Sequence, residues 1–244
     1  MDRRILCGVL LMSAIVSVQS AAAAPLIVNG GFELGFTGWT TMDQAGGDGT
    51  FFLQSGTTSP VNGLPVPPPP GGSTAAMTDA EGPGAHVLFQ DFLVPATVST
   101  ATLMFDWFVN NQDSTFRTPS TLLFDTPTLN QQARVDILRA AADPFSLSAA
   151  DLLLNVFRTN AGDPLASGYN TLTADIAAVL AANAGTTLRL RFAETDNVDL
   201  FNFGVDNISL DVNPQQVPEI PEPATLLLLG SGLAACAARR RKNV

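Results

Sequence analysis

Cysteine is nearly absent from this sequence of 244 residues. Only Cys7 and Cys236 occur, and both lie in apolar terminal segments that have the features of targeting signals. The long body between these segments contains no cysteine, which excludes disulfide bonds and thiol chemistry there. An oxidising compartment is therefore permitted for this protein but not exploited by it.

Histidine and lysine are equally scarce. His86 is the only histidine of the chain, and Lys242 is the only lysine. Because the body offers neither a second histidine nor a cysteine, we predict neither a zinc site nor a histidine-dependent catalytic triad.

Positive charge is also rare in the body. The chain has 12 Lys and Arg against 22 Asp and Glu; six of the basic residues but only one acidic residue, Asp2, lie outside residues 25–224. Residues 25–224 therefore carry a net charge of about −15, against −10 for the whole chain, and this part of the chain repels nucleic acid and anionic lipid. Most of its carboxylates are aspartates in turn-like stretches, a setting that suits calcium more than catalysis.

Residues 1–23 have the features of a secretory signal peptide. Arg3 and Arg4 precede an apolar run over residues 5–18, and small residues of the A-x-A kind follow it. We expect cleavage after Ala22 or Ala23, because Pro25 directly after the cut would be disfavoured. The implied partners are the Sec translocation machinery and signal peptidase.

The other end of the chain, residues 221–244, follows a linker at residues 213–220 and has three parts. These are a Pro-rich turn, an apolar run and a basic cluster: Pro221, Glu222 and Pro223, then residues 224–238, then Arg239, Arg240, Arg241 and Lys242. The run is shorter than the roughly 20 residues of a spanning helix, and the basic cluster would stay on the cytoplasmic side of a membrane. The pattern predicts a short hydrophobic helix that stops in the membrane transiently.

This C-terminal segment resembles the PEP-CTERM sorting signal of Gram-negative bacteria that make exopolysaccharide. The resemblance implies recognition by exosortase, a membrane transpeptidase, with cleavage near Pro221-Glu222-Pro223. It also implies an exported protein of the cell envelope, outer surface or extracellular matrix, which contacts the membrane through residues 221–244 before processing. The alternative is a C-terminal tail anchor that is not processed.

The body, residues 24–212, is expected to form one all-β domain, a jelly-roll β-sandwich of about six to ten strands with one or two short helices. Strands are predicted from alternating or apolar runs at residues 26–28, 50–54, 86–94, 101–109, 133–139, 156–158, 187–194 and 205–212. A helix is predicted from Thr173 to Gly185, and a helical turn after Ser148. The Pro-rich residues 55–73 are expected to form an exposed excursion from the domain.

The motif N-G-G-F-E at residues 29–33, followed by Trp39, resembles the start of galactose-binding-like jelly rolls found in secreted carbohydrate-binding modules. Phe32 and Trp39 are large enough to close the end of a sandwich core. In that family a glutamate and an aspartate of the final strand hold a structural calcium ion, which implies Glu33 and Asp206 as ligands. The alternative for Glu33 is a surface carboxylate beside a glycine turn.

Two other sets of carboxylates are alternatives for calcium. Asp43 and Asp48 flank a glycine-rich loop, although their spacing is not that of an EF-hand. Asp196 and Asp199 precede Asp206 closely enough in sequence for the three to be considered together.

A polar loop after the strand at 101–109 is the candidate ligand-binding surface. Asn111 and Arg117 could donate hydrogen bonds to sugar hydroxyls there, while Phe116 stacks on a sugar ring. The alternative is an ordinary solvated loop. Trp107 alternates with core positions and is expected to belong to the core rather than to a sugar platform.

The body offers little catalytic chemistry, so the expected function is a non-catalytic association with exopolysaccharide. One alternative is a secreted hydrolase that uses two carboxylates such as Asp106 and Asp136. Another is a structural matrix protein without a specific ligand. Two carboxylates in one cleft would favour the hydrolase, whereas an open aromatic face would favour binding.

Overall fold

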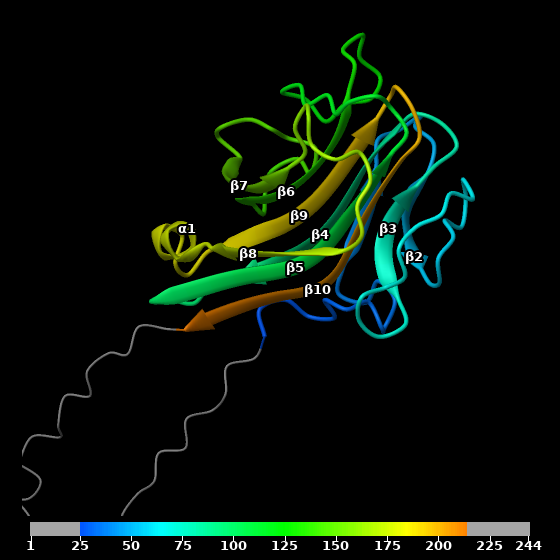
Figure 1. Cartoon of the computed structure of the whole chain (residues 1–244). Helices are drawn as coiled ribbons and strands as arrows, with labels where there is room; N and C mark the ends of the chain where they lie inside the picture. The colour runs from blue at the N-terminus through cyan, green and yellow to red at the C-terminus, as the bar shows by residue number, and fades with distance from the viewer. Residues whose placement is uncertain (1–24, 214–244) are drawn as a thin grey trace, which may run out of the picture.

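The structure, a computed structural model, describes residues 25–213 (Figure 1). The predicted signal peptide at 1–23, the linker after residue 213 and the sorting segment at 221–244 lie outside the described residues. Within the described part, none of the helical structure is both long and apolar enough to cross a membrane.

Two antiparallel five-stranded sheets pack face to face. The first sheet has the order β1 (Thr40–Asp43), β4 (Gly84–Leu93), β9 (Thr187–Asp196), β6 (Gln131–Arg139) and β7 (Leu152–Arg158). The second sheet has the order β2 (Thr50–Gln54), β3 (Ala75–Asp79), β10 (Phe201–Asn213), β5 (Thr100–Asn111) and β8 (Asn170–Asp175). From β3 onward every connection except β6 to β7 crosses between the sheets, which confirms the predicted jelly-roll sandwich.

The core lies between the sheets and follows the predicted alternation of side chains. In β5, Leu103 and Phe105 are buried in the core, whereas Met104 faces outward. Phe105 of the second sheet meets Phe192 of the first edge to face, with ring centroids 5.5 Å apart. The Trp39 ring centroid lies 6.0 Å from that of Phe192, and Phe32 packs against Trp39, so the large aromatic residues of the N-terminal motif help to close the core, as predicted.

The strand predicted at residues 26–28 is not formed. The N–H and carbonyl groups of Val28 are instead hydrogen-bonded by the side-chain amide of Gln90, at 2.8 and 3.0 Å. The segment then crosses β10 at Gly30, whose carbonyl accepts a hydrogen bond from the Ile208 N–H at 3.0 Å. A side chain at Gly30 would place its Cβ 1.9 Å from the Ile208 carbonyl oxygen, so the crossing requires glycine.

Three strands were not predicted from the sequence: β1, β3 and β8, the last of which takes up the start of the predicted helix. β1 is exposed along its whole length, and its Thr-Thr-Met-Asp sequence has no apolar alternation. β3 is buried on both faces but contains Ala-Ala-Met-Thr-Asp, which has little β-propensity. β1 and β3 form because an apolar neighbouring strand pairs with each of them.

The helix predicted from Thr173 to Gly185 is shorter than expected. Helix α1 spans only Ala177–Ala182, and Thr173 to Asp175 belong to β8. Pairing of β8 with β5, in which Ala174 opposes Leu103, overrides the helix propensity of this stretch. Gly185, at φ 75°, lies just after the helix, as predicted for its end. The turn predicted after Ser148 precedes β7.

The Pro-rich residues 55–73 form an irregular loop, but the loop is not simply an exposed excursion. Val66 is buried against Met77 and Phe108 on the outer face of the second sheet. The Asp79 carboxylate accepts hydrogen bonds from the Ser59 hydroxyl and the Val61 N–H. The loop therefore covers this face, which explains why β3 is buried on both sides.

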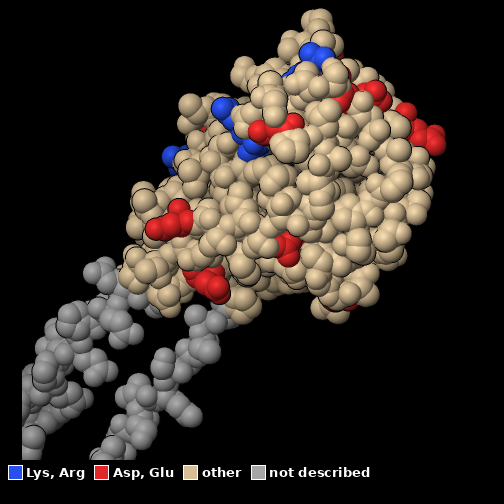
Figure 2. Space-filling model, viewed as in Figure 1, with Lys and Arg blue, Asp and Glu red and all other residues tan. Residues whose placement is uncertain are grey.

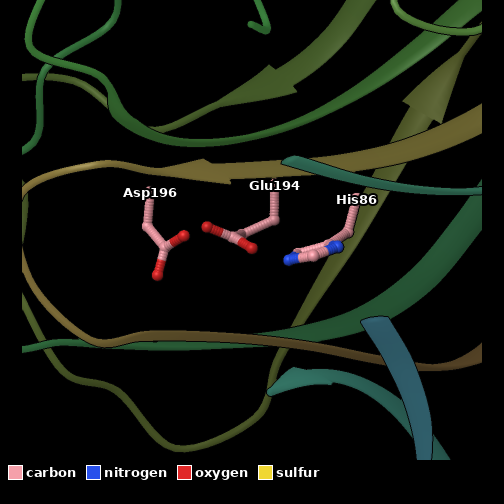
Figure 3. Close-up of side chains that lie close together, drawn as sticks. All are labelled: His86, Glu194 and Asp196. Carbon is pink, nitrogen blue, oxygen red and sulfur yellow. The ribbon is translucent and has the colours of Figure 1, made fainter. Parts of the chain in front are cut away.

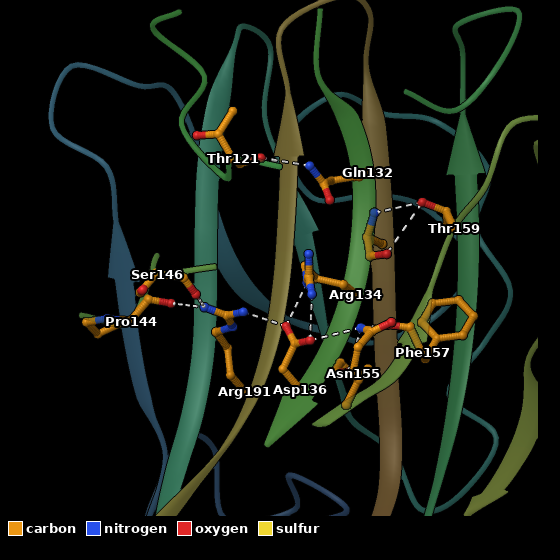
Figure 4. Close-up of polar contacts among 12 residues, drawn as sticks. Thr121, Gln132, Arg134, Asp136, Pro144, Ser146, Asn155, Phe157, Thr159 and Arg191 are labelled. Atoms are coloured by element: carbon orange, nitrogen blue, oxygen red, sulfur yellow. Dashed lines mark hydrogen bonds and ion pairs between the residues drawn. The ribbon is translucent and has the colours of Figure 1, made fainter. Parts of the chain in front are cut away.

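A loop also covers the outer face of the first sheet, and it is held there by hydrogen bonds from a buried arginine (Figure 4). Arg191, fully buried, donates to the carbonyls of Pro144 and Ser146 in the covering loop and to the Asp136 carboxylate at 2.5 Å. Asp136 also accepts from Arg134 and from the Asn155 amide. The arginines that face outward from β9 thus pair with carboxylates of the neighbouring strands β4 and β6, and they are buried.

We expect Asp136→Asn to lower the free energy of unfolding by about 3–5 kcal/mol, because it leaves buried arginines without their counter-charge. Asp91→Asn is the matched control. Asp91 pairs with Arg189 in the same sheet, but its side chain is 38% exposed, so the expected loss is below about 1 kcal/mol. Urea denaturation measures both changes. Equal losses would contradict the role of Asp136 as the counter-charge of the buried arginines.

Candidate functional site

A pocket of about 630 Å³ opens between the edge strands β7 and β8, where the two sheets separate. Its apolar floor joins residues of both sheets, and its rim carries hydroxyl, amide and carboxylate groups. The lining residues are Trp107, Val109, Phe116, Phe157, Thr159, Asp163, Pro164, Ser167, Asn170, Thr171, Leu172 and Thr173. An apolar floor with a few polar groups around it is typical of a small-molecule site.

Trp107 and Phe157 form the aromatic wall of this pocket. Their ring centroids are 4.4 Å apart, and Phe157 in turn stacks on Phe203 at 6.3 Å. Both pocket rings are half-buried, so they are held by the core and still line the pocket. Trp107 was expected to be a core residue, and it packs against the core while also lining the pocket.

Of the three predicted ligand residues, Asn111 and Phe116 are buried. The Asn111 side-chain oxygen accepts from the Asp113 N–H and the Gln131 amide, both at 2.9 Å. Phe116 is 1% exposed and packs on Phe201 at 5.6 Å. Phe116 reaches the pocket as part of its wall and does not present a free ring face, which corrects the expectation of an exposed stacking platform.

Arg117, the third predicted residue, is half-exposed and forms an ion pair with Asp113 at 3.0 Å. Burial opposes ionisation of Asp113, but hydrogen bonds from Ser114 and Arg117 outweigh it and lower the pKa of the carboxyl. The guanidinium of Arg117 is thus engaged within its own loop.

Glu33 and Asp206, the predicted calcium ligands, both hold residues 71–74 of the Pro-rich loop. Glu33 accepts from the Ser73 N–H and hydroxyl, each at 2.7 Å, and from the Thr74 N–H at 2.9 Å. Asp206, fully buried, accepts from the N–H groups of Asn207 and Gly71. Protein donors thus already occupy the carboxylate oxygens, and the geometry fits a loop clamp better than an ion site. Calcium at this position remains a prediction.

Neither of the other carboxylate sets considered from the sequence comes together as a whole, although Asp196 and Asp199 line one pocket. Asp43 contacts His86, whereas Asp48 accepts from the Glu81 N–H. Asp196 lies on the core-facing side of the first sheet, while Asp206 lies on the outer face of the second.

The carboxylate pair of the hydrolase alternative is also separated. Asp106 faces outward from the second sheet and accepts from Thr171 and Asn207. Asp136 faces outward from the first sheet, where it is enclosed by arginines. Because they lie on opposite outer faces of the sandwich, these two carboxylates cannot flank one substrate.

A buried polar cluster that the sequence did not reveal lies at one end of the core: His86 of β4 with Glu194 and Asp196 of β9 (Figure 3). The three side chains are at most 2% exposed. Burial and the charge of Asp196 raise the pKa of Glu194 well above its usual range, against a hydrogen bond from Thr78. Burial likewise raises the pKa of Asp196 to about 7, although the Gly84 N–H and His86 act in the opposite direction.

The sequence-based exclusion of a zinc site counted only histidine and cysteine ligands. The structure instead combines the one histidine with two carboxylates. The only sequence signal was an acidic residue at alternate positions of a predicted strand, Glu194 and Asp196, which places both on one face. Their meeting with His86 depends on the pairing of β4 and β9.

Residues 219–242 match the PEP-CTERM protein-sorting motif. The match includes Pro221, Glu222 and Pro223 and ends at Lys242, so it confirms the predicted sorting segment. The motif marks the chain as an exosortase-sorted, secreted protein of the cell surface. No curated protein matches the chain in sequence.

Several solved β-sandwiches are similar in fold. TmCBM61, solved in complex with beta-1,4-galactotriose, has 9% identity and a TM-score of 0.47 over 78% of this chain and 100% of that one. The K3 cleaved adhesin domain of Lys-gingipain from Porphyromonas gingivalis has 14% identity and a TM-score of 0.45 over 77% and 97%. The Stig cyclase Fisc from Fischerella sp. TAU has 16% identity and a TM-score of 0.45 over 80% and 100%. These likenesses concern the fold alone.

We expect Glu33→Gln to lower the melting temperature at pH 7. Hydrogen bonds from the Ser73 backbone and side chain, followed by that of the Thr74 backbone, lower the pKa of Glu33 to about 2, below its ordinary value of 4.5. A lowered folded-state pKa stabilises the fold above pH 4.5, and this contribution is lost as the pH falls toward 2. Thermal melts should therefore show a difference between wild type and variant that narrows over this range.

Glu81→Gln, at an exposed carboxylate elsewhere on the surface, is the control for Glu33→Gln. A Glu33→Gln effect that does not change between pH 7 and pH 2 would show that the charge of Glu33 does not clamp the loop.

Proposed function

We propose that this chain is an exosortase-sorted surface or matrix protein of a Gram-negative cell, whose β-sandwich binds a neutral saccharide of the exopolysaccharide without catalysis. The observation that carries the proposal is the pocket between β7 and β8 with its Trp107–Phe157 wall. Aromatic rings pack against the apolar C–H face of a sugar, and polar groups around them bind its hydroxyls. The sorting motif supports a cell-surface setting in which such a ligand is abundant.

The polar groups of the pocket suit a neutral sugar. Asn170, Thr171 and Thr173 lie on the exposed edge strand β8 and line the pocket from one side. Asp163 is the only charged residue among those that line it. The surface of the body is acidic, and Figure 2 shows Asp and Glu scattered over one face rather than gathered in a patch. An anionic saccharide would therefore be repelled, whereas a neutral one would not.

The absence of catalysis in this proposal is supported by the separation of Asp106 and Asp136. Inverting and retaining glycosidases need two carboxyl groups within about 5–10 Å across one substrate. The saccharide pocket is lined by a single carboxylate, Asp163. A purely structural matrix protein remains the competing function, and it predicts no saturable binding.

We expect Trp107→Ala to weaken the affinity for the producer's purified exopolysaccharide by about tenfold, since loss of an aromatic contact costs roughly 1 kcal/mol or more. Asn170→Ala, at an exposed rim position, should weaken binding without a change in stability. Affinity electrophoresis or calorimetry measures both. Leu93→Ala, at a position 63% exposed outside the pocket, is the control for loss of an apolar side chain, and equal binding by all variants would favour the purely structural role.

We expect the mature protein recovered from its producer to lack the residues beyond Pro221-Glu222-Pro223. Intact mass of the envelope and medium fractions measures this directly. A variant with Pro221→Ala and Pro223→Ala should keep its tail, because the recognition turn is lost. A wild-type protein that retains Arg239 to Lys242 would instead identify the segment as an unprocessed tail anchor.

A further inference from the structure

The cluster of His86, Glu194 and Asp196 is buried inside the sandwich (Figure 3), and none of its residues lines the proposed saccharide pocket. In the register of β4 with β9, His86 opposes Glu194, and Gly84 opposes Asp196. The three side chains point to the core-facing side, on the same face as Leu88 and Phe192. They form a polar end to an otherwise apolar core.

Two atoms of this cluster have no hydrogen-bond partner among the described residues, namely His86 Nε2 and Glu194 Oε1. The other ring nitrogen of His86, Nδ1, lies 2.8 Å from the Asp43 carboxylate. An ionised carboxylate only accepts, so we assign the proton to Nδ1, which leaves a lone pair on Nε2. The cluster thus directs a nitrogen lone pair and a carboxylate oxygen into one buried space with no donor between them.

The geometry points to a cation as the missing partner: we propose that His86 Nε2, Glu194 and Asp196 bind one divalent transition-metal ion of the Zn²⁺ class. One ligand atom from each residue lies within 4.8 Å of the others. Ligand atoms of one Zn²⁺ ion lie about 2.0–2.2 Å from it. The three atoms therefore need to move only slightly closer together to bind a common ion. Imidazole with carboxylates suits zinc and its neighbours, whereas calcium takes oxygen ligands.

The surroundings of the three residues are those of a metal site. Asp43 orients His86 through Nδ1, an arrangement common around metal-bound histidines, and the Gly84 N–H donates to Asp196 Oδ1 at 2.8 Å. Gly84 also leaves room beside the imidazole, because a Cβ there would lie 2.4 Å from His86 Nε2. Replacement by any other residue would therefore fill the space next to the proposed ligand atom.

One member of the cluster, Asp196, also lines a second pocket of about 290 Å³ together with Glu81 and Asp199, and these carboxylates attract a cation. His86 and Glu194 are each only 1% exposed, so a saccharide does not reach them. The competing account is a proton held within the cluster on Glu194, which would satisfy Nε2 without any metal.

The test uses the untagged full chain with Cys7→Ser and Cys236→Ser, stripped of metal and titrated with ZnCl₂ alone. Calorimetry and elemental analysis should give one Zn²⁺ per chain, and the melting temperature should rise because the ion binds the folded state. The single histidine allows a direct readout by ¹⁵N NMR: the signal of His86 Nε2 should shift on binding, while Nδ1 keeps its proton.

Variants separate the metal site from a merely polar core. Glu194→Gln should abolish binding, and Asp43→Asn, at a side chain 39% exposed, should weaken it about 10–100-fold as an orienting partner. Asp199→Asn, in the second pocket but outside the cluster, should keep one Zn²⁺ per chain, as should Trp107→Ala in the saccharide pocket.

The inference is overturned if saturating Zn²⁺ leaves the His86 Nε2 signal of the wild type unchanged, or if Glu194→Gln binds Zn²⁺ as well as the wild type. If Glu194→Gln does not fold, the wild-type NMR titration and Asp43→Asn decide the question by themselves.

Discussion

The constraint on which this structure depends is that the central strands of the first sheet are buried on both faces. β9 has a single exposed residue, at its start, and its remaining positions face either the core or a covering loop. Every polar side chain in it must therefore find an internal partner. On the outer face Arg189 and Arg191 do so with Asp91, Asp136 and loop carbonyls.

The same constraint applies to the core-facing side of β9. Glu194 and Asp196 continue β9 toward the end of the core, where the apolar residues stop, and His86 faces them from β4. Here His86 Nε2 and Glu194 Oε1 have no hydrogen-bond partner among the described residues, and on the outer face Arg191 Nε also has none. The two faces differ in chemistry: the outer face carries ion pairs between arginines and carboxylates, whereas the inner cluster combines an imidazole with two carboxylates.

A pocket opens between the edge strands β7 and β8, and this is the proposed saccharide site. The pocket joins aromatic residues of both sheets, Trp107 and Phe157, and β8 supplies polar groups at its rim. The proposed ion and the proposed saccharide therefore use different parts of one sandwich. The sorting motif at residues 219–242 is separate from both and concerns the destination of the protein.

Local patterns predicted much of the fold, because the alternation of apolar and polar side chains along a strand can be seen in consecutive residues. The strands at 101–109 and 187–194 were recognised for this reason, and β1 and β3 were missed because they lack that alternation. Helix propensity at 173–176 failed because pairing with β5 was stronger. Phe116 was expected at the surface because a polar loop around it concealed its packing on Phe201.

By itself the sequence determined the sorting segment, the all-β class and the acidic, cysteine-free body. Only the tertiary structure decided which polar residues meet. His86 and Glu194, Asp136 and Arg191, and Trp107 and Phe157 each come from strands far apart in the chain. The physical reason is that strand order and register bring these side chains together, and neither is encoded in the local spacing of residues.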